Sequence, residues 1–246
     1  MLPFSKQNAV FMRIKLLVLL SFSCSIICNS QTVVDVNKVE LPQTFYQSGG
    51  APYVSNQKYG RVIFGSAYLS EKWMPGSILL TNGTRYDSLR LRLDLLSGEV
   101  QYLDPLGDSL KVKAAIAELW LTDSRDNKRF HFYNGASKVI PALSQKRWCQ
   151  LLSDGEIMVL KEHNKEMNEQ SGYSNASKEF SIDENPRYFL YTNGQLRTIK
   201  KLGDIPELLN DKSAELKNFI KSNGLNGKND TDYSRLIHYY YEVKGK

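Results

Sequence analysis

Apolar and polar residues alternate through much of the chain between Arg61 and about Lys200, and this period of two constrains the fold more than any other feature. At 88–95 four leucines alternate with polar residues, which predicts a strand with one face on a core and the other in water. Asn-Gly pairs at 82–83 and 193–194 tolerate the positive φ that tight hairpins require. Turn signals separate further predicted strands at 99–104, 109–113, 115–122, 128–134, 145–152 and 156–162. Short strands joined by short turns imply an antiparallel meander over 61–202, sandwich-like or a partly closed barrel.

Other patterns flank and interrupt this β-domain. Residues 31–60 contain prolines, paired glycines and scattered polar residues, so we interpret them as a mostly irregular leader. Residues 163–186 break the alternation and are predicted to form a polar insertion, a kind of segment that is usually mobile or functional. After Leu202, the helix-opening sequence Asp204-Ile205-Pro206-Glu207 precedes apolar residues at helical spacing. The sequence therefore predicts a mainly β fold (β+α) that ends in a short helical tail over 203–246.

Residues 1–30 have the order of a secretory signal peptide. Basic residues without any acidic ones precede an apolar run at 16–28, and the small residue Ser30 follows. The run is shorter than the roughly 20 apolar residues that a membrane-spanning helix needs, and no later segment approaches that length. We therefore expect export to the periplasm, to the outer membrane or out of the cell, with no transmembrane span in the mature chain.

The same segment determines what the composition means. Cleavage after Ser30 would remove three basic residues, which halves the formal net charge of +6, and would leave Cys149 as the one cysteine. A fold without a disulfide must be stabilised by an ordinary core, which a chain of this length can supply. Two questions stay open: the candidate starts are Met1 and Met12, and the candidate lipidation sites, both in poor lipobox triplets, are Cys24 and Cys28.

The three histidines, His131, His163 and His238, do not have the spacing of metal ligands. There is no H-E-x-x-H motif, and a single cysteine cannot build a structural zinc site. Phosphate-binding glycine loops and EF-hand calcium loops are also missing from the sequence. We therefore expect no metal and no cofactor, and we interpret His131, between Phe130 and Phe132, as an ordinary exposed or half-buried strand residue.

Two residues are candidate nucleophiles. Ser174 lies in Gly172-Tyr173-Ser174-Asn175-Ala176, a near miss of the G-x-S-x-G elbow, but the polar insertion offers no strand and helix to present its hydroxyl. Cys149 would need a nearby base or helix N-terminus to lower the pKa of its thiol, and a strand interior supplies neither. We interpret Cys149 as a buried small hydrophobic residue, which leaves Ser174 as the one weak catalytic candidate.

Basic and aromatic residues are mixed on the predicted strands in a way that a platform for single-stranded nucleic acid would need. The basic residues are Arg85, Arg90, Arg92, Lys111, Lys113, Lys128 and Arg129, and the tyrosines are Tyr86, Tyr102 and Tyr133. Acidic residues such as Asp87, Asp94 and Glu99 share the same strands, so a solvated outer face explains the pattern better. Together with export, this leads us to expect that nucleic acid is not a partner.

Several sequence patterns resemble those of uncharacterised exported proteins of the Bacteroidetes. The resemblance covers most of residues 60–242, and the patterns that carry it are Asn29-Ser30-Gln31, Gly65-Ser66-Ala67-Tyr68-Leu69, Trp73-Met74-Pro75-Gly76, Asn82-Gly83-Thr84-Arg85-Tyr86, the run 89–94, the stretch 218–225 and the stretch 236–240. These are turn, core and helix-end patterns. The resemblance therefore implies a lineage and a fold, and it implies no known activity, cofactor or catalytic residue.

Export without a convergent catalytic set favours one class of function. The leading hypothesis is a non-enzymatic cell-envelope protein, a binding or structural module for a protein or an envelope polymer. The alternative is an envelope hydrolase that uses Ser174 or carboxylates in the insertion at 163–186, because paired carboxylates can come together only in the fold.

Overall fold

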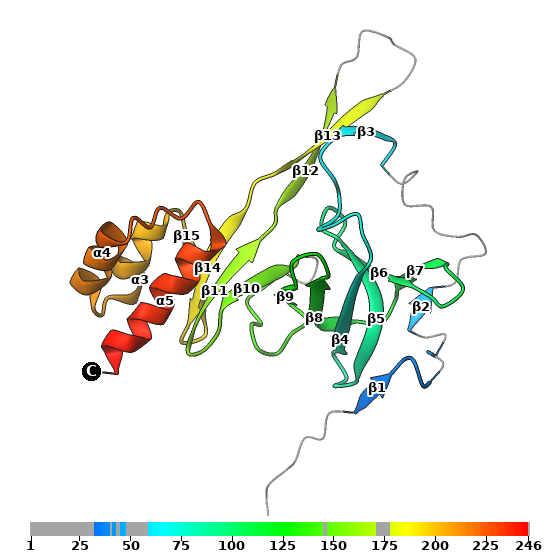
Figure 1. Cartoon of the computed structure of the whole chain (residues 1–246), viewed down its shortest axis with the longest axis horizontal. Helices are drawn as coiled ribbons and strands as arrows, with labels where there is room; N and C mark the ends of the chain where they lie inside the picture. Colours follow the sequence, from blue (N-terminus) through cyan, green and yellow to red (C-terminus); the bar gives the residue numbers. More distant parts are fainter. Residues whose placement is uncertain are drawn as a thin grey trace, which may run out of the picture. The chain divides into compact units, whose positions relative to one another are not determined.

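The computed structural model describes residues 32–39, 41–42, 45–47, 59–144, 147–170 and 178–245, which belong to one compact unit beginning at Thr32. Their architecture is mainly antiparallel β with helices at the C-terminal end, which confirms the predicted fold class (Figure 1). The predicted signal peptide and Ser174 lie outside the described residues. Within the described ranges, no helix is long and apolar enough to cross a bilayer.

Twelve of the described strands form one large sheet in the order β15-β14-β11-β10-β9-β8-β4-β5-β6-β7-β2, with β1 paired to β5. These strands are β1 (Val33–Asp35), β2 (Tyr46–Gln47), β4 (Met74–Leu80), β5 (Arg85–Asp94), β6 (Glu99–Leu103), β7 (Ser109–Val112), β8 (Ile116–Asp123), β9 (Lys128–Tyr133), β10 (Cys149–Ser153), β11 (Ile157–Glu162), β14 (Arg187–Thr192) and β15 (Gln195–Ile199). Most neighbours are consecutive hairpin strands, as a meander requires. β1 and β2 both lie in the leader that was expected to be mostly irregular, so that region contributes two short strands to the sheet.

The connection from β7 to β8 forces the large sheet to curl. Only residues 113–115 separate Val112 from Ile116, and at full extension this connection spans at most about 15 Å. In a flat sheet β7 and β8 would lie four strand spacings apart, about 19 Å at roughly 4.8 Å each. Strands β4–β8 therefore bend around a core whose fully buried members include Phe45, Ile78, Leu91, Leu119 and Phe132. The two ends of the described strand order do not pair with each other, so the curl is partial.

The helical tail packs on the part of the large sheet that contains β11, β14 and β15. A 3-10 turn (Leu202–Asp204) leads into α3 (Ile205–Leu209), α4 (Ser213–Ser222) and α5 (Asp230–Lys244). Side chains from both layers share one buried cluster, which includes Val159, Leu190, Ile199, Leu216 and Leu236. The tail and this part of the large sheet therefore form a second hydrophobic core.

Residues 163–186 contain two strands where a break in the strand pattern was expected. β12 (Lys165–Gln170) pairs antiparallel with β13 (Glu179–Glu184), and β3 (Arg61–Phe64) joins β13 in parallel. We call these three strands the small sheet, which is separate from the large sheet. Both faces of β12 are mostly polar, so the alternation that indicates other strands is missing there.

Candidate functional site

The segment between β3 and β4 covers a face of β5 that was predicted to meet water. Tyr68 forms a β-bridge with Asp94, and the Arg92 guanidinium lies 4.3 Å and 4.4 Å from the ring centroids of Tyr68 and Trp73. Arg92 and Asp94 are both buried, so the prediction of a solvated face is wrong for this end of β5. Alternation shows that two faces differ in polarity, and it does not show whether another segment covers the polar one.

Both buried charges have polar partners. Arg92 donates from Nε and Nη2 to Gln101 Oε1, at 3.0 Å and 2.7 Å. Asp94 accepts hydrogen bonds from the Tyr59 hydroxyl and, at 3.0 Å, from the Ser97 N–H. Such bonds offset the cost of burying a charge. Together with the Arg92 contacts to Tyr68 and Trp73, they hold the segment between β3 and β4 against β5 and β6.

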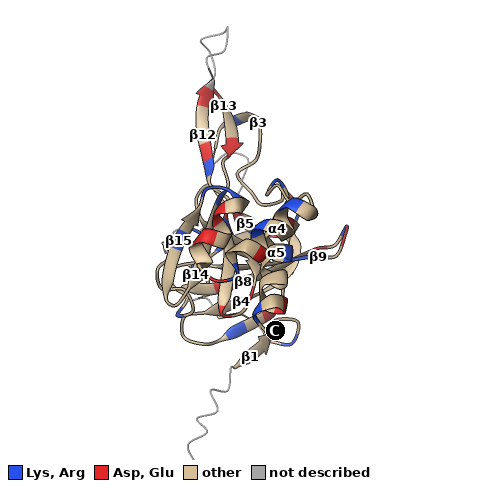
Figure 2. Ribbon diagram, turned by 90° about the vertical axis from the view of Figure 1, so that its left-hand side faces the viewer, with Lys and Arg blue, Asp and Glu red and all other residues tan. Residues whose placement is uncertain are grey.

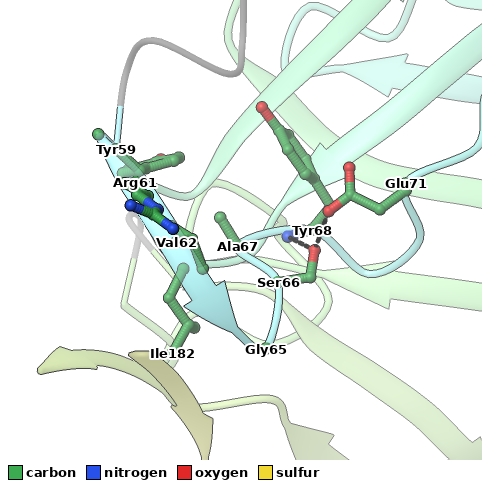
Figure 3. Close-up of a pocket in the computed structure, with 10 residues that line it drawn as sticks. Tyr59, Arg61, Val62, Gly65, Ser66, Ala67, Tyr68, Glu71 and Ile182 are labelled. Carbon is green, nitrogen blue, oxygen red and sulfur yellow. Dashed lines mark hydrogen bonds between the residues drawn. The ribbon is translucent and has the colours of Figure 1, made fainter. Parts of the chain in front are cut away.

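A cavity of about 370 Å³ lies between this segment and the small sheet (Figure 3). Its lining includes Tyr59, Arg61, Ser66, Tyr68, Glu71 and Ile182. The Ser66 hydroxyl donates to the exposed Glu71 carboxylate, and the Tyr68 N–H donates to Ser66 Oγ at 3.1 Å. The cavity thus combines aromatic and aliphatic walls with one carboxylate whose position is fixed by a neighbour.

Gly65 permits the segment between β3 and β4 to approach the small sheet closely. Its φ is +79°, and a Cβ atom at this position would lie 1.9 Å from the carbonyl oxygen of Ile182. A residue with a side chain would therefore meet both backbone strain and a backbone clash.

The junction between the two sheets is built around His163. Its Nδ1 donates to Glu184 Oε1 at 2.7 Å, and its Nε2 lies 2.9 Å from Gln150 Oε1 in β10. The hydrogen bond from His163 holds the pKa of Glu184 below its ordinary value, although partial burial opposes the shift. One histidine therefore links the first residues after β11 to both β10 and β13.

Lys165 connects the same junction to the segment between β3 and β4. Its buried ammonium donates to the carbonyl oxygens of Ser66 and Tyr68, both at 2.7 Å, and lies 3.8 Å from Glu184 Oε2. Burial lowers the pKa of Lys165, while the charge of Glu184 acts in the opposite direction. Lys165 thereby holds the first residue of β12 against the cavity-lining residues Ser66 and Tyr68.

The small sheet exposes large apolar side chains at its edges. Ile63 and Phe64 in β3 are 51% and 69% exposed, and Met167 in β12 is 41% exposed. Both β3 and β12 are edge strands, and the exposed neighbours of Met167 are polar or charged: Glu166, Asn168 and Glu169. Charged residues are a usual protection of an edge against pairing with another chain. β3 carries only Arg61 in that role, so its edge is the more apolar of the two, although β3 has only four residues and its register with β13 shifts between Phe180 and Ser181.

Carboxylates outnumber basic groups on the small sheet (Figure 2). Its strands carry Glu166, Glu169, Glu179, Asp183 and Glu184 against Arg61 and Lys165. These carboxylates are paired, in the same order, with Asn164, Lys178, Arg61, Asn168 and His163. Since the whole chain has a formal charge of +6, the small sheet is an acidic region of a basic chain.

The predicted candidate residues do not converge on this site. His131 lies in β9 with its Nε2 2.9 Å from Glu118 Oε2, and its ring stacks on Trp120 at 4.6 Å between centroids, which confirms a half-buried strand histidine. His238 is exposed in α5 beside Glu242. Among the residues that the structure describes, no three His, Cys, Asp or Glu side chains form a group that could hold a metal ion.

Cys149 is buried in β10, between β9 and β11, as the sequence predicted. Burial and the charge of Glu162 raise the pKa of its thiol to about 12, so the thiolate is scarce at neutral pH. Ser174 falls in the range 171–177, outside the described residues. Its catalytic role therefore stays a prediction.

The tyrosines of the basic and aromatic pattern, Tyr86, Tyr102 and Tyr133, are buried. Burial raises the pKa of Tyr102, and Arg92 from the same pattern is buried as well. These rings cannot offer free faces to bases, so the pattern does not form a stacking platform for single-stranded nucleic acid. The expectation that nucleic acid is not a partner stays a prediction.

Sequence reasoning missed the residues that define this site, above all Ile63, Phe64, Glu71 and Lys165. A signal for β3 does exist, because Val62-Ile63-Phe64 is an apolar run without alternation on a strand that ends at a glycine. No signal exists for the cavity. Its walls come from residues near 60–70 and from Ile182, which only the pairing of β3 with β13 brings together.

Fold and site define a mainly antiparallel β protein with a curled large sheet, a packed helical tail and a small acidic sheet that has an apolar edge. No family model, curated protein or solved structure matches the chain. What the site does is therefore argued from its own chemistry.

Proposed function

We propose that this chain is an exported, non-enzymatic binding module of the cell envelope and that its small sheet docks a partner protein. The observation that carries the proposal is the exposed apolar edge of β3, formed by Ile63 and Phe64. An apolar strand edge is a template on which another polypeptide can pair. A protein is favoured over an envelope polysaccharide because the main-chain donors and acceptors of a strand edge have the same spacing as those of another extended polypeptide.

The way in which the small sheet is held supports the same function. His163 and Lys165 fix its base through hydrogen bonds to side chains and carbonyls of the surrounding elements. A preorganised surface loses less conformational entropy on binding, which favours a docking role. The basic, apolar and small-residue order of residues 1–30 supports export, and the resemblance to exported Bacteroidetes proteins agrees with a periplasmic, outer-membrane or extracellular location.

The alternative, an envelope hydrolase using Ser174 or carboxylates near 163–186, has less support. The described carboxylates of that segment each accept a hydrogen bond or an ion pair from a neighbouring side chain, as structural carboxylates do. Two carboxylates that share one reacting bond would instead face a common cavity. The hydrolase hypothesis stays a prediction.

Affinity capture from envelope extract tests the docking function. The bait is the wild-type protein, the double variant Ile63→Thr with Phe64→Ser, or Leu106→Ser as a matched control, because Leu106 is an 88% exposed apolar residue in the turn between β6 and β7. We expect one protein to be recovered by the wild type and by Leu106→Ser and to be lost with the double variant. Equal recovery by all three baits, or no reproducible protein on the wild type, would contradict the proposal.

A further inference from the structure

The small sheet also indicates what kind of segment its partner supplies. We infer that the partner contributes an extended, basic segment, which adds as a strand to the free edge of β3 and places one lysine or arginine side chain in the cavity beside Glu71. This inference rests on the proposed docking function and goes beyond it by naming the chemistry of the partner. It follows from the strand edge, the cavity and the charge of the small sheet.

The strand edge determines the backbone conformation of the partner. β13 occupies one side of β3, and among the described residues no strand occupies the other side. A chain that pairs there lies about 4.8 Å from β3, close enough to cover the exposed side chains of Ile63 and Phe64. Alternate side chains of the added strand point to the same face, so only one in two can enter a pocket next to β3.

The cavity determines the side chain. Arg61 and Val62 of β3 line it, so it adjoins the strand on which the partner would pair. Its volume of about 370 Å³ accommodates a long side chain, with the aliphatic stem of a lysine or arginine against Tyr59 and the cation near Glu71. A carboxylate has roughly four acceptor positions, and Ser66 uses one of those of Glu71.

The charge of the small sheet determines the sign of the partner. The strands of the small sheet carry five carboxylates and two basic groups. Both basic groups already have partners, since Arg61 lies 3.1 Å from Glu179 and Lys165 donates to the carbonyl oxygens of Ser66 and Tyr68. Docking of a second copy of this chain on the same edge would bring two acidic sheets together, which like-charge repulsion disfavours. A basic segment neutralises the surface instead.

Fluorescence anisotropy with defined peptides tests this inference on the purified full chain. The probe is a fluorescent ten-residue peptide of alternating valine and lysine, and the comparison peptide replaces each lysine with glutamate. A third peptide keeps the lysines but carries N-methyl groups on consecutive backbone nitrogens, which removes the hydrogen-bond donors from both of its edges. We expect the lysine peptide to bind at low salt, and both other peptides to bind at least about tenfold more weakly, because strand addition needs main-chain hydrogen bonds as well as charge.

Two protein variants separate the cavity from the general charge. Glu71→Gln should weaken the lysine peptide by about three- to fivefold, the size expected for a partly exposed charge pair. Glu156→Gln removes the same charge from an 80% exposed side chain that pairs with Lys244 in the helical tail, and its effect should stay below about twofold. Circular dichroism confirms that both variants are folded.

Four results would overturn the inference: equal binding of the glutamate peptide, equal binding of the N-methylated peptide, equal effects of the two glutamate substitutions, or a dimer in sedimentation that Ile63→Thr with Phe64→Ser abolishes. The capture experiment distinguishes this failure from a failure of docking itself. If the double variant loses a captured protein that the lysine peptide does not displace, docking stands and the basic strand is wrong. If no protein is captured but the lysine peptide binds as described, the strand site stands and the envelope partner is wrong.

Discussion

Gly65 shows how one residue without a side chain fixes the site. Its φ is positive, and an added Cβ atom would lie 1.9 Å from the Ile182 carbonyl oxygen, so β13 must move if a methyl group is introduced. We expect Gly65→Ala to lower the free energy of unfolding by about 3 kcal/mol or more. Gly83→Ala is the matched control, because Gly83 has a φ of +88° with nothing within 4 Å, so only strain of about 1–2 kcal/mol applies. Equal losses in urea unfolding would contradict the argument.

The hydroxyl of Tyr68 tests the covering segment in another way. It is buried without a hydrogen-bond partner among the described residues, while the ring contacts the Arg92 guanidinium at 4.3 Å. Tyr68→Phe keeps the ring and removes the unpaired hydroxyl, so we expect it to raise the free energy of unfolding by up to about 1–2 kcal/mol. Tyr68→Ala loses the ring and should cost about 3 kcal/mol or more. A clear loss of stability with phenylalanine, measured by urea unfolding, would show that the hydroxyl has a partner.

The junction between the small and large sheets makes stability depend on pH through Glu184. Since the hydrogen bond from His163 lowers the folded-state pKa of Glu184, its contribution is complete above the ordinary value of 4.5 and is lost as the pH falls through the lowered value. We expect Glu184→Gln to reduce the free energy of unfolding at about pH 6 and to differ less from the wild type at about pH 3. Urea unfolding at both values measures this difference. A difference that does not change with pH would assign the effect to packing instead of charge.

Individual strands were predictable where one face lies on a core. The run predicted at 115–122 corresponds to β8 (Ile116–Asp123), whose alternate side chains include the fully buried Leu119. The same reasoning failed for β12, because the small sheet has little core of its own and Met167 stands alone among polar residues. The same reasoning wrongly predicted that Arg92 is exposed to solvent. The segment between β3 and β4 covers that side of β5, and its path cannot be read from the alternation.

At the level of the whole molecule, the sequence predicted the fold class but not the path of the chain. The pairing of β4 with β8 joins strands that are far apart in sequence. Gly76 is a local sign of this pairing, because a Cβ atom there would lie 2.3 Å from the Trp120 carbonyl oxygen. The helical tail was expected from its caps and its apolar spacing, and its packing on β14 and β15 follows from the need to bury that face. The site was beyond prediction because it lies where these long-range pairings meet.

Cys149 can report whether the curled core and the helical core unfold together. It lies in β10, which neighbours β9 of the curled region and β11 of the helix-covered region. Its thiol is buried and mostly protonated because its pKa is raised to about 12, so a thiol reagent must wait for an opening of the sheet. At about pH 8 we expect labelling of the native protein to be about a thousandfold or more slower than in urea, as mass spectrometry of the Cys149 peptide would measure.

Substitutions in each core then decide between cooperative and separate opening. Leu119→Ala in the curled core and Leu236→Ala in the helical core each remove a fully buried side chain and should cost about 2–5 kcal/mol. If the two cores unfold as one unit, both variants accelerate the labelling of Cys149 in proportion to their loss of stability. We expect this result, because β10 and β11 pair through Leu151 and Leu160 and connect the two regions within one sheet. A labelling rate that Leu119→Ala raises and Leu236→Ala leaves unchanged would mean that the helical tail opens independently.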